Sequence, residues 1–276
     1  MKICIVGLGL IGGSYAMGLS KKGHKVYGID KNTQAIQFAK DKGFILEGFN
    51  KETAIIEECD CIILAIYPQA ILDFLYKNQE HFKENQIITD VRGVKNSFVR
   101  KATLLARKAT YLSHHPMAGR EKIGIEYADD KIFNGANFII TPLEEAPQHA
   151  MDVLKEIAQD LNFGKITIVS LDKHDQMIGF TSQLTHAIAV SLVNSDYAED
   201  TQRFIGDSYR DLTRIAMINE VLWSELFLEN REILLKHIEN FESELNVLKL
   251  ALKQGDCALL QELFIKSTNI RRKMEK

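Results

Sequence analysis

The stretch that decides the fold lies at the N-terminus and reads Lys2-Ile-Cys-Ile-Val-Gly7-Leu-Gly9-Leu-Ile-Gly12. A short run of apolar, mostly β-branched residues leads into G-x-G-x-x-G, and this pattern opens a helix. Gly7 permits a tight turn, Gly9 lets the backbone approach a pyrophosphate, and Gly12 allows the helix to pack close to the strand. Phosphates would lie at the helix N-terminus, where unpaired N–H groups and the helix dipole favour negative charge. The stretch therefore predicts a dinucleotide-binding fold.

A carboxylate follows the second predicted strand, about twenty residues after the glycines. Asp30 can accept hydrogen bonds from the adenosine ribose hydroxyls, and its charge would repel a 2′-phosphate, which favours NAD over NADP. The neighbouring Lys31 could tolerate a phosphate, and the alternative for Asp30 is a helix N-cap or turn residue. The predicted cofactor-binding residues are Gly7, Gly9, Leu10, Ile11, Gly12 and Asp30.

Short apolar runs alternate with amphipathic stretches as far as residue 170, which is typical of parallel strands joined by crossover helices. We expect strands at 3–6, 25–29, 61–66, 86–89, 111–113, 137–141 and 166–169, and helices at 12–21, 33–41, 70–78, 95–107 and 147–161. The strand signal then disappears, and the remainder indicates helices with breaks at 200–206 and 255–256. The sequence predicts an α/β chain with a doubly wound Rossmann domain at 1–170 and an all-helical domain at 171–276.

The composition excludes several classes of protein. A chain of 276 residues with 46% hydrophobic and 26% charged residues is typical of a globular protein with two domains. The net charge of −3 and the absence of an arginine-rich stripe argue against a nucleic-acid partner. The sequence contains no run of about eighteen uncharged apolar residues, so it predicts no membrane span. Cys4, Cys59, Cys61 and Cys257 are interpreted as buried free thiols in a reducing cytoplasm, and without metal-ligand spacing we expect no metal.

The segment 219–253 carries apolar residues at a spacing close to 3.6, which predicts one long amphipathic helix. Its apolar stripe needs a partner surface. That surface could belong to neighbouring helices of the same chain, or the stripe could form a subunit interface.

Four further motifs distinguish the chain from a generic Rossmann protein. They read Asp90-Val-Arg-Gly-Val-Lys95, Ser113-His-His-Pro-Met-Ala-Gly-Arg-Glu121, Ser182-Gln-Leu-Thr-His186 and Asp211-Leu-Thr-Arg-Ile-Ala216, with Trp223 following. This succession resembles the prephenate/arogenate dehydrogenase family of tyrosine biosynthesis, over essentially the whole chain. The resemblance implies NAD-dependent oxidative decarboxylation of prephenate to 4-hydroxyphenylpyruvate, with arogenate as the alternative substrate. It also implies a homodimer formed through the helical domain.

His115 is the predicted catalytic residue. It follows a strand and precedes a proline, so we expect it in a loop at the carboxyl edge of the sheet, where open α/β folds bind ligands. A neutral imidazole there could accept a proton from a substrate hydroxyl as hydride leaves the same carbon. The alternative, a histidine bonded to a loop backbone, is the commoner use of a lone histidine. The resemblance favours catalysis, because the family's catalytic histidine occupies this H-P position.

Arg214 is predicted to bind a substrate carboxylate, since a guanidinium offers a rigid pair of donors. Asp211 lies three residues earlier, so the alternative is an ordinary surface ion pair. The resemblance implies that Arg214 contacts substrate and that Asp211 and Glu121 support it. It likewise places His186 near the substrate side chain, with Ser182 one turn earlier. Trp223 could line the pocket or fill the core.

Two departures from the family pattern concern the substrate. Gly93 stands where the family usually has a serine that holds the catalytic histidine, and Ser97 and Ser113 are the candidates to replace it. Gln183 and Thr185 replace a histidine and a proline, which leaves the choice between prephenate and arogenate open.

Two other functions compete with this interpretation. A β-hydroxyacid dehydrogenase would carry a catalytic lysine in an Asn-x-x-Lys setting, and none occurs between residues 182 and 195. A non-catalytic protein that senses NAD would need the glycines and Asp30, but it would have no reason to keep His115, His186 and Arg214 together.

Overall fold

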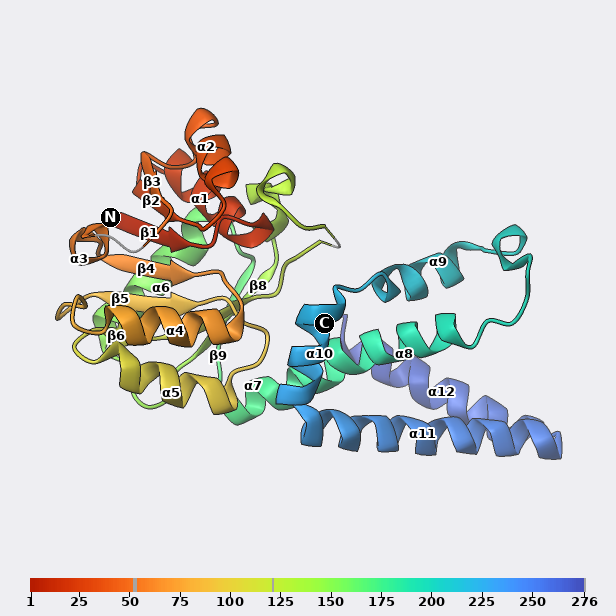
Figure 1. Ribbon diagram of the computed structural model, residues 1–276. Helices are drawn as coiled ribbons and strands as arrows, with labels where there is room; N and C mark the ends of the chain where they lie inside the picture. Colours follow the sequence, from red (N-terminus) through yellow and green to blue (C-terminus); the bar gives the residue numbers. More distant parts are fainter. Residues whose placement is uncertain (52–53, 121, 276) are drawn as a thin grey trace.

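The computed structural model describes residues 1–51, 54–120 and 122–275, which form an α/β part followed by a helical part (Figure 1). The α/β part lies on one side of the molecule, and the helices from α8 onward extend away from it. This arrangement confirms the predicted fold class.

A six-stranded parallel sheet forms the centre of the first part. Its strands are β1 (Lys2–Val6), β2 (Lys25–Ile29), β3 (Glu47–Phe49), β4 (Cys61–Leu64), β5 (Ile87–Asp90) and β6 (Thr110–Tyr111). Their order is β3-β2-β1-β4-β5-β6, so the direction of winding reverses between β1 and β4. Ligands of such sheets bind in the crevice beyond the carboxyl ends of the strands at this switch point. The glycine loop after β1 lies there.

Helices cover both faces of this sheet, and the predicted ones are confirmed to within two residues at each end. They are α1 (Leu10–Lys21), α2 (Thr33–Asp41), α4 (Pro68–Asn78), α5 (Asn96–Ala106) and α6 (Gln148–Asp160). The sequence analysis missed β3 and α3 (Ile55–Glu58), which have three and four residues and are too short to establish a period.

The strand predicted at 111–113 is wrong, because the chain changes sheets there. After β6 it enters β7 (Ser113–Pro116), which pairs antiparallel with β8 (Asn137–Thr141); β8 pairs parallel with β9 (Lys165–Ile168). His115 faces Ile139 in this pairing, so it lies in a strand and not in the predicted loop. The ladder with β8 keeps the chain extended through Pro116.

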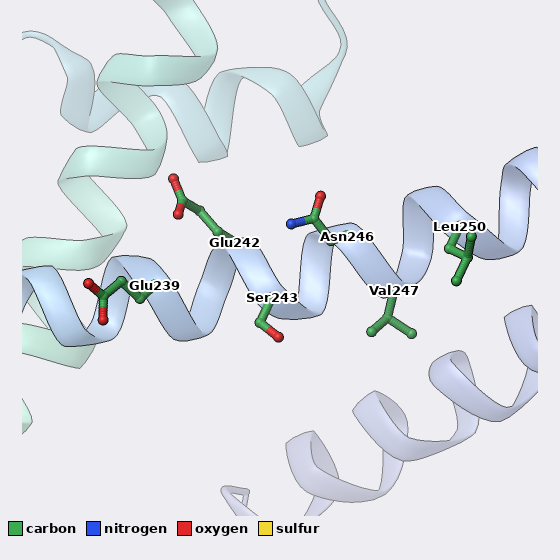
Figure 2. A pocket seen from close by; sticks show the side chains of 6 residues that line it. All are labelled: Glu239, Glu242, Ser243, Asn246, Val247 and Leu250. Atoms are coloured by element: carbon green, nitrogen blue, oxygen red, sulfur yellow. The ribbon is translucent and has the colours of Figure 1, made fainter.

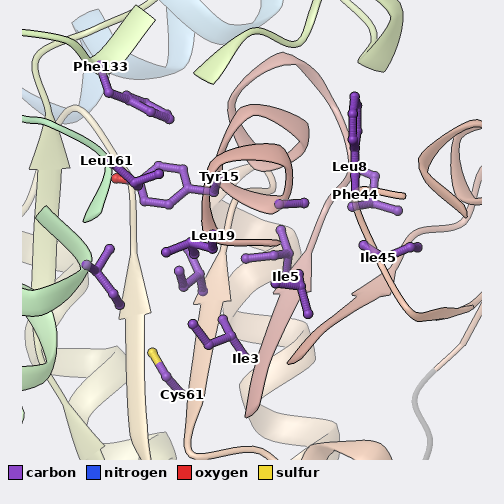
Figure 3. Packing of buried hydrophobic residues seen from close by; sticks show 14 of the residues in the cluster. Ile3, Ile5, Leu8, Tyr15, Leu19, Phe44, Ile45, Cys61, Phe133 and Leu161 are labelled. Carbon is purple, nitrogen blue, oxygen red and sulfur yellow. The ribbon is translucent and has the colours of Figure 1, made fainter. Parts of the chain in front are cut away.

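The alternation of side chains along β1 divides the core into two layers. Ile3 and Ile5 point into a cluster with Tyr15, Leu19 and the side chains of α6, as Figure 3 shows for part of it. Cys4 and Val6 point to the opposite face, which α4 and α5 cover. Successive strand residues face opposite sides of a sheet, so both faces of β1 are apolar and buried.

The second part consists of helices. It comprises α7 (Leu171–Ile178), a π-helical turn (Gly179–Gln183), α8 (Leu184–Asn194), α9 (Asp207–Thr213), a 3-10 turn (Arg214–Ala216), α10 (Glu220–Glu229), α11 (Arg231–Gln254) and α12 (Cys257–Lys273). The predicted breaks are present, and Gly255 ends α11 in the left-handed conformation while Asp256 caps α12.

The single helix predicted over 219–253 is wrong, because the helix breaks at Asn230. The buried Asn230 side chain donates to the backbone oxygen of Asp175 at 3.1 Å and to Gln183 Oε1 at 2.6 Å. These tertiary hydrogen bonds hold the chain in a non-helical conformation between α10 and α11, although the apolar spacing continues across it.

Cys4, Cys59 and Cys61 are buried free thiols, as predicted, whereas Cys257 is exposed at the first residue of α12. The prediction of burial is therefore wrong for Cys257. Within the described ranges, no helix is long and apolar enough to cross a membrane.

Candidate active site

The glycine loop has the geometry that its sequence requires. Gly7 has φ 94°, and a Cβ there would lie 2.4 Å from Ala65 O. A Cβ on Gly12 would lie 1.8 Å from Gly7 O, whereas one on Gly9 would meet no atom within 4 Å. Gly7 and Gly12 are thus required by the protein itself, and the space beside Gly9 is open to a pyrophosphate.

Asp30 joins the second strand to the glycine loop. Its Oδ2 accepts a hydrogen bond from Leu8 N at 2.6 Å, and its Oδ1 accepts one from Asn32 N at 2.8 Å. Asn32, not Asp30, caps α2, so the N-cap alternative for Asp30 is wrong, whereas the contact of its Oδ1 with Asn32 N is that of a turn residue, the other alternative. The carboxylate is fixed beside the loop, where an adenosine ribose would bind.

A buried ion pair supports the strand that carries the two histidines. Lys95 Nζ lies 3.0 Å from Asp90 Oδ1, and both side chains are fully buried. Lys95 also donates to the backbone oxygen of His114 at 2.6 Å, and Tyr111 donates to Asp90 Oδ2 at 2.6 Å. Burial lowers the pKa of Lys95 to about 8 despite the opposing effect of Asp90. Burial alone would raise the pKa of Asp90, but Lys95 holds it well below its ordinary value.

His114 is a structural histidine. Its Nδ1 lies 2.6 Å from Thr89 Oγ1, its Nε2 lies 2.7 Å from the Tyr15 hydroxyl, and its ring stacks on Phe138. Burial, with Lys95 nearby, lowers the pKa of His114 to about 3. The ring is therefore neutral, and both of its nitrogens are engaged inside the first domain.

His115 points to the other side of β7, toward the helical part. Its Nδ1 lies 2.9 Å from His174 Nε2, and His174 Nδ1 lies 2.8 Å from Asp175 Oδ1. Burial, followed by the neighbouring His174, places the pKa of His115 well below its ordinary value. The ring is thus neutral at physiological pH and available to accept a proton.

Gly93 lies next to this ring. A Cβ on Gly93 would lie 4.0 Å from His115 Cε1 and 3.6 Å from Leu226 of α10. The partner of His115 Nδ1 is His174, so the candidate Ser113 does not fill that role. The side chain of Ser97 lies outside the described part of the structure.

His186 and Trp223 form one aromatic unit. Their rings stack with centroids 3.7 Å apart at 29°, and His186 Nδ1 lies 2.8 Å from Ser182 O in the π-helical turn. Single-turn π segments inside helices are frequent at functional sites. Trp223 and Leu226 are on the same helix, so α10 spans the distance between His186 and the Gly93–His115 region.

Gln183, one of the departures from the family pattern, has a structural role. It is buried, and its Nε2 donates to Leu226 O at 2.8 Å while its Oε1 accepts from Asn230. Gln183 therefore holds α10 in place over Gly93.

Arg214 begins the 3-10 turn after α9, and this turn packs against α8, the helix that carries His186. Arg214 and Asp211 are both exposed. Within α9, Arg210 and Asp207 form an ion pair at 2.9 Å. Glu121, the third member of the predicted network, lies outside the described residues.

Sequence reasoning missed His174 and Asp175, which follow the last strand in the run Leu171-Asp-Lys-His-Asp175. No motif marks them, because their partner is almost sixty residues away in the chain. It also missed Arg92, whose guanidinium forms an ion pair with Glu229 of α10 and lies 3.8 Å from the centre of the Phe98 ring. Arg92 thus connects the end of β5 to the helical part.

Two features lie apart from these residues. A surface hollow follows α11 and is lined by side chains of that helix alone (Figure 2). His24, Glu156 and Asp160 bring their ligand atoms within 4.8 Å of one another, although His24 already contacts Asp160 and the amino group of Met1.

Comparisons with known proteins agree with this geometry in both parts of the chain. Residues 15–167 match the nucleotide-binding domain of prephenate dehydrogenase, and residues 170–266 match its dimerization domain. The prephenate dehydrogenase of Lactococcus lactis is 32% identical, over 99% of this chain and 77% of its own. The cyclohexadienyl dehydrogenase of Zymomonas mobilis is 28% identical, over 98% and 94%.

Solved structures give the same result. The prephenate dehydrogenase of Aquifex aeolicus, solved with hydroxyphenyl propionate and NAD+, is 30% identical and superposes with a TM-score of 0.86 over 100% of this chain and 98% of its own. Synechocystis arogenate dehydrogenase is 26% identical, with a TM-score of 0.85 over 99% and 100%. Both parts of the chain therefore match one known family of oxidoreductases, and the chain belongs to the prephenate dehydrogenase family.

Proposed function

We propose that the protein is an NAD-dependent prephenate dehydrogenase with His115 as its general base. The observation that carries the proposal is the position of His115, whose ring lies beside Gly93 on the carboxyl side of the Rossmann sheet and contacts His174 through Nδ1. Burial also lowers the pKa of His115. The match of both domains to one family supports the substrate, and the Aquifex relative with NAD+ supports the cofactor.

Each predicted site residue has a separate role in the proposed reaction. Arg214 binds a carboxylate of prephenate, with Asp211 and Glu121 supporting it. His186, with Ser182 and Trp223, surrounds the side chain of the substrate. His115 accepts the proton of the C4 hydroxyl through Nε2. NAD, when bound at the phosphate loop, would supply the hydride acceptor for C4, and loss of the ring carboxylate as carbon dioxide would leave 4-hydroxyphenylpyruvate. The protein mainly positions the reactants and supplies charge complementarity.

The open space at Gly9 and the fixed carboxylate of Asp30 fit the dinucleotide. Gly7, Leu10, Ile11 and Gly12 complete the phosphate loop, with the helix N-terminus facing the pyrophosphate. Asp30 is expected to accept from the ribose hydroxyls and to disfavour NADP.

An initial-rate comparison tests this function. Prephenate and arogenate are each offered with NAD and with NADP, and cofactor reduction is followed at 340 nm. We expect the highest kcat/KM for prephenate with NAD. A higher kcat/KM for arogenate would show that arogenate, not prephenate, is the substrate. If neither substrate led to reduction of the cofactor, the proposal would be contradicted.

We further propose that residues 1–170 and 171–276 are separate domains and that the second joins two copies of the chain. Large apolar side chains of α11 and α12 are exposed, among them Leu245, Leu252, Phe264 and Ile265. The hollow along α11 adjoins this surface (Figure 2). A second copy of the helical domain would cover it, which the match to a dimerization domain supports. The buried free thiols of the first domain are compatible with the cytoplasm, where we place the enzyme.

A further inference from the structure

His115 is the first of three polar side chains that are linked by contacts which no sequence motif predicts. We infer that His174 and Asp175 are positioning residues that hold His115 in a single tautomer, with its Nε2 free for the substrate. The inference rests on the proposed role of His115 as the base. His174 and Asp175 are each 1% exposed, and the two contacts that join the three residues measure 2.9 and 2.8 Å.

The order of donors follows from the carboxylate. An ionised aspartate can only accept, so the hydrogen of His174 lies on Nδ1 and its Nε2 carries a lone pair. That lone pair accepts from His115 Nδ1, which must then carry the hydrogen. The Nε2 of His115 is left unprotonated, which is the state a general base requires.

Asp175 cannot turn away from this arrangement. Its carboxylate also accepts from the backbone N–H groups of Lys95, at 2.9 Å, and Asn96, at 2.8 Å, at the start of α5. Its backbone oxygen accepts from Asn230. Both ends of the residue are therefore fixed, and the orientation of His174 is fixed with them.

Among the described side chains, His174 is the hydrogen-bond partner of the His115 ring. Gly93 follows β5 at the position where the family pattern has a serine, and it has no side chain to offer. When His115 accepts the substrate proton, the positive charge lies against the lone pair of His174, whose far side faces the Asp175 carboxylate. This arrangement stabilises the imidazolium without a second proton transfer.

Substitution of His174 separates positioning from packing. His174→Leu keeps the volume and removes the acceptor, and we expect kcat to fall roughly ten- to a hundredfold, the scale for a misplaced catalytic group, with little change in KM. His174→Gln retains an acceptor, and it should recover most of the lost rate. Equal losses in both variants would overturn the inference, as would a wild-type kcat in His174→Leu.

The pH profile gives a second readout. The charged and titratable groups around the pair are Asp90, Lys95, His114 and Asp175. Removal of the acceptor destabilises protonated His115, so the acid limb of kcat/KM should move to lower pH in His174→Leu. A move to higher pH would show that His174 acts as a positive charge, and this result would overturn the inference.

Asp175→Asn is a second variant that tests the same inference if His174→Leu does not fold. It keeps an oxygen for the N–H groups of α5 but removes the charge, so we expect a several-fold lower kcat and the same direction of pH shift. His24→Gln is the matched control, because His24 forms another histidine–aspartate contact, 2.7 Å from Asp160. It should leave kcat and the pH profile unchanged.

A wild-type enzyme inactive with prephenate and arogenate would contradict the proposed function. An active enzyme that is insensitive at His174 and Asp175 would contradict only this inference.

Discussion

The two domains differ in how completely they bury their apolar residues. Nearly all the large apolar side chains of the parallel sheet are fully buried, whereas few in the helical domain are, and Leu250, Leu252, Phe264 and Ile265 are at least half exposed. The sheet part completes its own core, whereas the helical part leaves large apolar side chains exposed, and this is the surface that we propose a second copy of the chain covers. The proposed reaction has the same division: the first domain holds the cofactor and the base, and the second holds the groups that recognise substrate.

The largest effect is expected where the chemistry is assigned to the first domain. His115→Asn should lower kcat roughly a hundredfold or more, the usual scale for losing a general base. Stopped-flow or steady-state measurement of NAD reduction checks this. Because His115 is only partly buried, thermal unfolding should change little. A near-normal kcat would show that another residue is the general base, and the proposed division of roles between the two parts would then be wrong.

The next effect concerns the closed core. Buried His114 has a pKa of about 3, below its ordinary 6.5, so between these values the unfolded chain binds a proton that the folded chain does not. Stability must therefore fall as pH falls below 6.5, and His114 contributes about 2 kcal/mol of this loss between pH 7 and pH 5.

Denaturant unfolding at several pH values tests this contribution. His114→Gln should flatten the dependence by about that amount, whatever its own effect on stability at pH 7. An unchanged slope would show that His114 is not held neutral by the core.

A smaller effect is expected at the recognition side. Arg214→Gln should raise the KM for prephenate roughly tenfold, because a charged hydrogen bond is lost, while kcat changes less. Steady-state kinetics with saturating NAD measures both constants. The opposite pattern, a low kcat with a normal KM, would assign Arg214 to the chemical step.

The smallest effect concerns the open surface of the helical domain. Phe264→Glu places a charge on an exposed apolar site and should weaken the dimer roughly fivefold, the scale for losing a partly buried aromatic side chain. Sedimentation at several concentrations measures the dissociation constant. A monomeric wild-type chain would remove the proposed reason for the exposed surface.

The sequence was sufficient for the features that local chemistry determines. The glycine loop, Asp30 and the apolar alternation of the sheet strands are short-range patterns, and the structure has the corresponding elements. The motif containing His115 could be located, but its place in β7 depends on pairing with β8, which lies more than twenty residues further along the chain.

The features that escaped prediction depend on distant partners. The break at Asn230 is caused by hydrogen bonds to Asp175 and Gln183, and no residue near Asn230 interrupts the helical spacing. The contact between His115 and His174 is of the same kind. Such contacts become visible only when helices and strands are placed in space.

The hydrogen bonds of Asp175 have a mechanical consequence. Its side chain is attached to α5 of the first domain, and its backbone is attached to Asn230 between α10 and α11. Arg92 adds a second attachment through Glu229. These contacts attach the helical part to the sheet part beside residue 170, so a hinge motion at that junction would have to break them.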